Sequence, residues 1–175
     1  DVLLVHSELS SPENDVFSNK QVTGVQVTSL EERVRRYRGY CVWRPINNPL
    51  SNEQILEFVK QAYHMAYHIP LDVTVSFFVL KISKADKLYK VRCLDRLTES
   101  YRRRHADDMV EPFHKKKNTF CTEFVGALFE WCGVFDQKKG PYKSYYMPSD
   151  FTFEKLNHYL TNGYRFDNEG WELVC

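Results

Sequence analysis

The stretch that decides the fold is NTFCTEFVGALFEWCGV, residues 118–134. It predicts an amphipathic helix, because five apolar side chains recur at helical spacing on one face: Phe124, Val125, Leu128, Trp131 and Cys132. Asn118 is a typical N-cap residue and Gly133 a typical helix terminator. We therefore expect Cys121 in the first turn of this helix, on the same buried-side face.

A cysteine at the start of a helix has two interpretations. The unpaired amide groups and the partial positive charge of a helix N-terminus stabilise a thiolate, which is how many cysteine nucleophiles are activated. Cysteine is also among the most buried residue types, and a small apolar side chain in a core helix needs no chemistry to explain it. The local features of Cys121 leave both interpretations open.

The composition is that of an ordinary soluble protein. The 175 residues fit a single domain, residues 1–175, and 43% of them are hydrophobic while 27% are charged. Since 24 basic residues nearly balance 23 acidic ones, we expect no nucleic-acid partner. The basic residues nevertheless cluster, which solvated faces or an anionic membrane surface would explain: Arg33, Arg35, Arg36 and Arg38, Arg102 to Arg104, and Lys115 to Lys117.

The cysteines and histidines indicate neither a metal site nor a cofactor. The chain has five scattered cysteines, Cys41, Cys93, Cys121, Cys132 and Cys175, without CxxC spacing. His64 and His68 are four residues apart, but no HExxH pattern surrounds them, so cap or interface roles are favoured. An odd number of cysteines and no apolar run near the roughly 18 residues that cross a bilayer predict an intracellular, cytoplasmic setting.

Strands and helices follow from residue type and capping pattern. Strands are predicted over 1–7, 21–28 and 40–46, where apolar and β-branched residues run together, and a hairpin or a pair of short strands is predicted around 168–170. The stretch 73–82 fits a strand or a buried helix. Capping boxes that pair Thr28 with Glu31 and Ser51 with Gln54 predict two helices, and Ser149 is a predicted N-cap of another.

Three blocks of the chain, roughly residues 2–8, 24–46 and 119–153, resemble a known family. A strand that ends in a polar residue precedes GVQVTSLEERVRRYRGYCVWRP, and FCTEFVGALFEWCGV precedes YYMPSDF. This order resembles the circularly permuted NlpC-type papain-like cysteine amidases and peptidases, which include YiiX-like and poxviral proteins and, more distantly, lecithin retinol acyltransferase. The most specific element is a Cys-Ser/Thr-Glu helix start with a downstream Pro-Ser-Asp.

The resemblance implies an α+β fold in which an antiparallel sheet packs against helices and the nucleophile opens a helix. Cys121 matches that nucleophile, and His6 falls on the strand that supplies a polar orienting residue. The family's histidine would belong to a strand just upstream of Asp1. Either such a strand precedes the chain, or His6 acts as the base, or the protein is an inactive relative. The stretch 72–117 is longer than the family pattern and is expected to be a lid or insertion.

The activity implied by the resemblance is that of a thiol hydrolase or acyltransferase. A Cys–His pair, Cys121 with His6, would cleave an amide or ester through a thioester acyl-enzyme, as a cysteine peptidase or amidase does. The expected substrates are lipid-linked or amino-acyl compounds. The alternative is a catalytically inactive papain-like scaffold that binds a protein or an anionic membrane, because a fold does not determine an activity.

Overall fold

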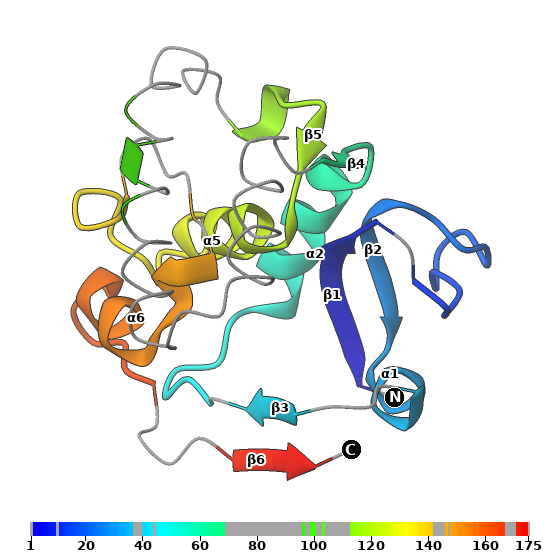
Figure 1. Ribbon diagram of the computed structural model, residues 1–175, viewed down its shortest axis with the longest axis horizontal. Coiled ribbons are helices and arrows are strands. Elements are labelled where there is room, and N and C mark those ends of the chain that lie inside the picture. The colour runs from blue at the N-terminus through cyan, green and yellow to red at the C-terminus, as the bar shows by residue number, and fades with distance from the viewer. Residues whose placement is uncertain are drawn as a thin grey trace, which may run out of the picture.

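Helices and short sheets mix along the chain in this computed structural model (Figure 1), so the predicted α+β class is confirmed in its general form. The structure describes residues 2–9, 11–36, 40–43, 45–68, 96, 99–100, 103, 113–141, 146, 148–166 and 171–174. Its strands are β1 (Leu3–Glu8), β2 (Gly24–Ser29), β3 (Tyr40–Trp43), β4 (Ala66–Tyr67), β5 (Asn118–Thr119) and β6 (Trp171–Val174). Its helices are α1 (Leu30–Arg36), α2 (Asn52–Ala62), α5 (Cys121–Trp131) and α6 (Phe153–Tyr159), with short 3₁₀ turns η2 (Phe113–Lys115) and η4 (Pro148–Phe151).

Helix α5 confirms the prediction made from residues 118–134, with corrections at both ends. Gly133 adopts φ +72° just after the helix, the left-handed conformation that glycine tolerates best. The N-cap is Phe120 and not Asn118, because Asn118 and Thr119 form β5. Cys121 is exposed rather than on the buried side of the helix, and Trp131 is 44% exposed.

Strands β1 and β2 form an antiparallel hairpin whose two faces have different surroundings. Val5 lies opposite Val27 and Ser7 opposite Val25, and both β2 valines belong to the hydrophobic core. Because side chains alternate between the faces of a strand, His6 and its partner Gln26 point to the other face. That face is also covered, since Gln26 and Thr28 are fully buried.

The core lies between this hairpin, α2 and α5 (Figure 1). Helix α5 packs against β1 and α2, and its residues Phe124 and Leu128 are buried as predicted. The ring of Tyr146 rests on Gly126, where an added Cβ would come within 2.0 Å of it. The remaining buried core side chains include Phe58, Val59, Ala62, Met65, Val134, Phe135, Leu156, Tyr159, Leu160 and Phe166.

Capping patterns in the sequence located one helix start correctly and misplaced two others. Ser51 caps α2 by accepting a hydrogen bond from the Gln54 amide, as predicted. The Ser149 prediction is wrong, because α6 begins after Thr152. The Thr28 capping box is also wrong: Thr28 lies in β2, and the amide of Glu32 at the start of α1 donates to Ser29.

The end of the chain contains a predicted short strand, whereas the predicted turn at 168–170 lies outside the described residues. Strand β6 pairs antiparallel with β3, and Phe166 forms an isolated bridge with Ile46. The stretch 73–82 lies outside the described residues, as does most of 72–117. No helix in the described ranges is both long and apolar enough to span a bilayer.

Candidate functional site

Cys121 occupies the first position of α5, with its thiol free and exposed. The preceding residue, Phe120, has an extended backbone and no side-chain cap hydrogen bond, so the first amide groups of the helix are not covered by a capping side chain. The residues before Phe120 form β5, which pairs with β4 and holds the helix start in place. The thiol is therefore presented to solvent at the positive end of a helix whose opposite side is core.

The first turn of α5 is anchored by a buried carboxylate, Glu123. One of its oxygens accepts a hydrogen bond from the Thr119 hydroxyl at 3.2 Å, and the other pairs with the ammonium of Lys116. Glu123 is only 4% exposed, so it is shielded from solvent and its carboxylate is compensated by these two partners. Its role is to hold residues 116–119 against the helix that carries Cys121.

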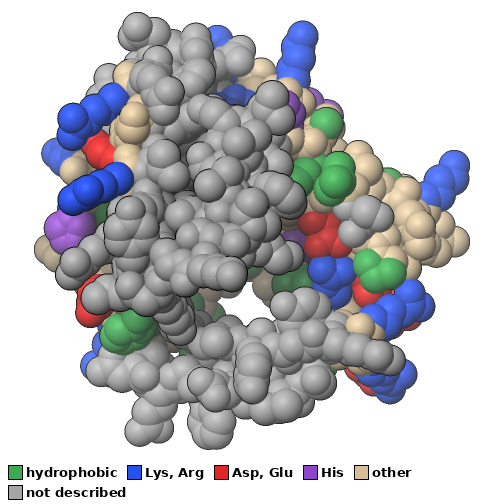
Figure 2. All heavy atoms as spheres, viewed as in Figure 1, with side chains coloured by type: hydrophobic (Ala, Val, Ile, Leu, Met, Phe, Trp, Pro, Cys, Tyr) green, Lys and Arg blue, Asp and Glu red, His purple; other side chains and the backbone are tan. Residues whose placement is uncertain are grey.

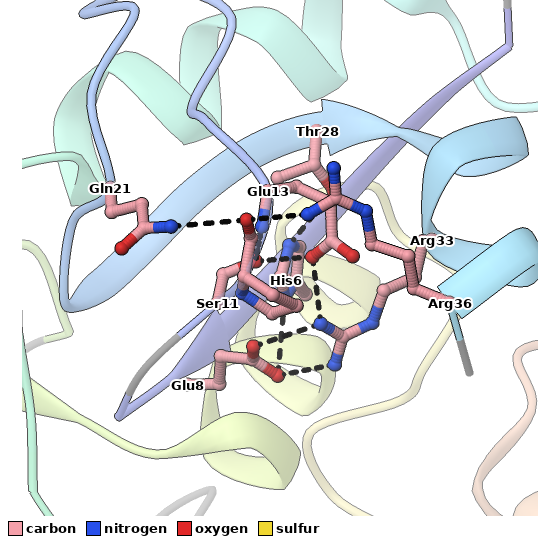
Figure 3. Close-up of polar contacts among 9 residues, drawn as sticks. His6, Glu8, Ser11, Glu13, Gln21, Thr28, Arg33 and Arg36 are labelled. Carbon is pink, nitrogen blue, oxygen red and sulfur yellow. Dashed lines mark hydrogen bonds and ion pairs between the residues drawn. The ribbon is translucent and has the colours of Figure 1, made fainter. Parts of the chain in front are cut away.

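His6 lies on the outer face of β1 and is engaged there. Its Nε2 atom is 3.1 Å from the Thr28 hydroxyl, and its Nδ1 atom is 3.8 Å from a carboxylate oxygen of Glu8 (Figure 3). Burial lowers the pKa of His6, and the positive charge of Arg33 adds to that effect, while Glu8, Glu13 and Asp15 oppose it. The imidazole is consequently neutral near pH 7.

The contacts described for His6 are with Thr28 and Glu8, not with Cys121. Val5 and Ser7 lie on the core face of β1, the face against which α5 packs, and His6 lies between them on the opposite face. Neither the hydrogen bond of His6 nor its ion pair involves the thiol. The assignment of His6 as the base for Cys121 stays a prediction, and the geometry gives His6 a role in the hairpin.

A partly buried ion cluster lies around His6 (Figure 3). The guanidinium of Arg33 forms two hydrogen bonds with Glu8, at 2.6 and 3.1 Å, and one with Glu13 at 2.9 Å. Ser11 donates to the same oxygen of Glu13 at 2.6 Å. Burial raises the pKa of the Glu13 carboxyl, but the hydrogen bonds from Ser11 and Arg33 outweigh burial and leave that pKa below its usual value. This cluster ties α1 and segment 11–15 to β1.

Segment 11–15 ends in a second anchor, Asp15, at the far edge of β2. Its carboxylate accepts hydrogen bonds from the amides of Val27 and Ser18 and from the hydroxyl of Tyr63 at 2.5 Å. Asp15 is fully buried, so these bonds compensate its charge. The segment that covers His6 is thus fixed at both of its ends.

The pKa of His6 yields a prediction about stability. A histidine whose pKa is lower in the folded than in the unfolded protein binds protons less well when folded, so stability falls as the pH drops below about 6.5, the unfolded value. We expect the free energy of unfolding of His6→Gln, measured in urea between about pH 5 and 7, to fall less with acidification than that of the wild type. An equal fall in both proteins would contradict this prediction.

The described arginines of the basic clusters are paired, whereas two of the lysines are exposed. Arg33 pairs with Glu8 in the ion cluster, Arg35 pairs with Glu31, and Arg36 donates to the carbonyl of Pro12. Figure 2 shows acidic and basic side chains intermingled on the side where the hairpin and α1 lie. Lys116 is also paired, with Glu123, whereas Lys115 and Lys117 are exposed.

Of the other polar residues considered, Tyr146 and Asp150 are buried, whereas His68 is exposed and its amide bonds Thr119 beside the start of α5. Tyr146 is fully buried and donates to Glu130, and Asp150 accepts from Tyr159, so aromatic packing explains this region. His64 and His68 are exposed, and the described residues contain no cluster of three or more metal-ligating side chains. The side chain of His114 lies outside the described residues.

Two described residues at the site were missed by the sequence analysis. Tyr67 lies opposite Thr119 in the paired strands β4 and β5, two residues before Cys121, and the charge of Cys121 is one cause of its raised pKa. Gly24, at φ +98°, allows β2 to approach the carbonyl of Met65, just before β4. The only sequence signal for Gly24 was a glycine inside a strand pattern, which often marks a close backbone approach. Tyr67 carried no local signal, because a two-residue strand has no readable periodicity.

Comparison of the chain with models of protein families, with curated proteins and with solved structures finds no match. The family resemblance therefore rests on the residues quoted for it, and the geometry around Cys121 carries the functional argument.

Proposed function

We propose that the chain is a thiol hydrolase or acyltransferase with a permuted papain-like fold, and that Cys121 attacks the carbonyl carbon of an amide or ester. One observation supports this most: an exposed, free thiol is the first side chain of α5, a helix otherwise anchored in the core. A helix N-terminus favours the anionic, nucleophilic form of a thiol. A purely structural cysteine would gain nothing from this exposed position.

The reaction would proceed through a thioester. The sulfur of Cys121 forms a bond to the carbonyl carbon, the bond from that carbon to nitrogen or oxygen breaks, and the leaving group takes up a proton. Water or an acceptor alcohol or amine then cleaves the thioester. The backbone amide of Cys121, at the helix start, is a candidate donor to the oxyanion. Lipid-linked and amino-acyl substrates are proposed from the family resemblance alone.

The second candidate function is a catalytically inactive interaction module. The observation that favours it is the position of His6, which points away from the layer of α5 and is bound to Thr28. In such a protein the scaffold would be retained and the acid–base partner of the cysteine lost. The two functions differ in one measurable property, the reactivity of Cys121.

Alkylation by iodoacetamide tests whether the thiol is activated. We expect Cys121 to be modified at neutral pH faster than the thiol of glutathione and at least roughly 10-fold faster than Cys132, because burial raises the pKa of the Cys132 thiol. The modified cysteines are mapped by mass spectrometry in the native protein, and Cys121→Ser identifies the peptide. Modification of Cys121 no faster than glutathione would favour the inactive module.

Acylation by p-nitrophenyl acetate then tests the chemistry itself. A burst of p-nitrophenol that matches the enzyme concentration is expected for the wild type, since acyl-enzyme accumulates when the thioester is cleaved slowly. The burst should vanish in Cys121→Ser and persist in the matched control Cys132→Ser. A burst that survives in Cys121→Ser would overturn the proposed function.

A further inference from the structure

Strand pairing places Tyr67 beside the start of α5. Strands β4 and β5 are parallel, with Tyr67 opposite Thr119, two residues before Cys121. The Ala66 amide donates to the Lys117 carbonyl at 3.0 Å and the His68 amide to the Thr119 carbonyl at 3.1 Å, so hydrogen bonds flank Tyr67 on both sides. The position of Tyr67 relative to the thiol is therefore set by backbone and not by a mobile loop.

A second contact fixes β4 from the other side. The Val25 amide of β2 donates to the Met65 carbonyl, and the absence of a side chain at Gly24 lets the two backbones meet. Strand β4 is thus held between the β1–β2 hairpin and the residues that lead into α5. A group held this way is preorganised, and preorganised donors stabilise developing charge most effectively.

Towards the thiolate of Cys121, the hydroxyl of Tyr67 can act only as a donor. Burial, the adjacent charge of Cys121 and the charge of Glu8 raise the pKa of Tyr67 to about 12. The hydroxyl therefore keeps its proton throughout the neutral range. Catalytic hydrogen bonds are often long in a free enzyme and shorten when the substrate binds.

We propose that Tyr67 is a catalytic residue of the reaction proposed for Cys121: its hydroxyl donates first to the thiolate and then to the carbonyl oxygen of the substrate. A lone pair of the sulfur forms the C–S bond and the π electrons of the carbonyl move to its oxygen, while the proton stays on Tyr67. The negative charge thus moves from the sulfur of Cys121 to the carbonyl oxygen of the substrate, and the Tyr67 hydroxyl donates to each of them in turn. This inference rests on the proposed function.

Tyr67→Phe tests the inference, because it removes the hydroxyl and keeps the ring. We expect alkylation of Cys121 at neutral pH to slow by roughly 10-fold, the usual effect of one hydrogen bond to a charged group. The p-nitrophenyl acetate burst should slow by about 10² to 10³-fold, as when one oxyanion donor is removed. The matched control is Tyr63→Phe, which removes a nearby hydroxyl that bonds Asp15 and not the thiol.

The outcomes separate this inference from the proposed function. If the wild type acylates on Cys121 and Tyr67→Phe does so at the same rate, the role of Tyr67 is overturned and the proposed function stands. If the wild type shows no Cys121-dependent burst, both are overturned. Equal slowing in Tyr63→Phe and Tyr67→Phe would also overturn the role of Tyr67, because a general loss of structure would then explain both. Thermal unfolding of each variant shows whether it is folded.

Discussion

Gly24→Ala is expected to destabilise the protein by about 3 kcal/mol or more. Gly24 has φ +98°, a conformation that side chains rarely adopt, and a Cβ there would lie 2.1 Å from the carbonyl oxygen of Met65. The clash is with backbone, so no rotamer change relieves it. Alanine would push β4 away from β2, and the urea midpoint of unfolding should fall accordingly.

Gly163→Ala is the matched control for this substitution. Gly163 has φ +96°, almost the same as Gly24, but an added Cβ meets no atom within 4 Å. Its cost should be that of the backbone conformation alone, about 1 kcal/mol. The difference between the two variants measures the close approach of β2 and β4. Equal losses would mean that the backbones can separate at little cost, and Tyr67 would then not be held firmly at the thiol.

The parts of the fold that sequence could predict are those with a local signal. Helix α5 follows from the spacing of Phe124 and Leu128, and the start of α2 follows from Ser51. The N-cap of α5 was misplaced because Asn118 pairs with β4, an interaction between distant segments that no local propensity reports. The partner of strand β6 could not be predicted for the same reason, since β3 is distant in sequence.

The face of His6 could not be predicted from the run LLVHS. Alternation identifies a buried face only when the other face is polar and solvated, and here Leu4 and Val5 are both apolar and both faces of the hairpin are covered. The pairing of β1 with β2 decides which face His6 occupies. Val25 and Val27 join the core, so Gln26 and His6 lie on the opposite face of the hairpin. The sequence therefore indicated a polar residue on β1 without indicating its neighbours.

The ion cluster around Arg33 leads to the second large effect. Arg33→Met is expected to cost roughly 3 kcal/mol, the lower end of the range for breaking a buried ion pair, because Arg33 itself is partly exposed. The side chain of Glu13 is completely buried, and without Arg33 its carboxylate would keep, among the described contacts, the one hydrogen bond from the Ser11 hydroxyl. Urea unfolding at neutral pH measures the loss.

Two control substitutions distinguish the cost of leaving Glu13 charged and unpaired from the cost of losing an arginine side chain. Arg35→Met removes an exposed pair with Glu31 on the same helix and should cost at most about 0.5 kcal/mol. Glu13→Gln in the Arg33→Met background removes the unpaired charge and should restore part of the stability. If the double variant were no more stable than Arg33→Met alone, the cost would come from lost packing of the arginine side chain.

The pH dependence of stability provides a second, independent test of the pairing between Arg33 and Glu13. The pKa of Glu13 in the folded protein is below its usual value of 4.5, so the stability that its pairing contributes is present at neutral pH and is lost as the pH falls below about 4.5. Arg33 remains charged throughout. The difference in stability between wild type and Arg33→Met should therefore shrink with acidification, since protonated Glu13 no longer needs a cation. A difference that stays constant with pH would assign the stabilising effect of Arg33 to the packing of its side chain and not to its ion pairs.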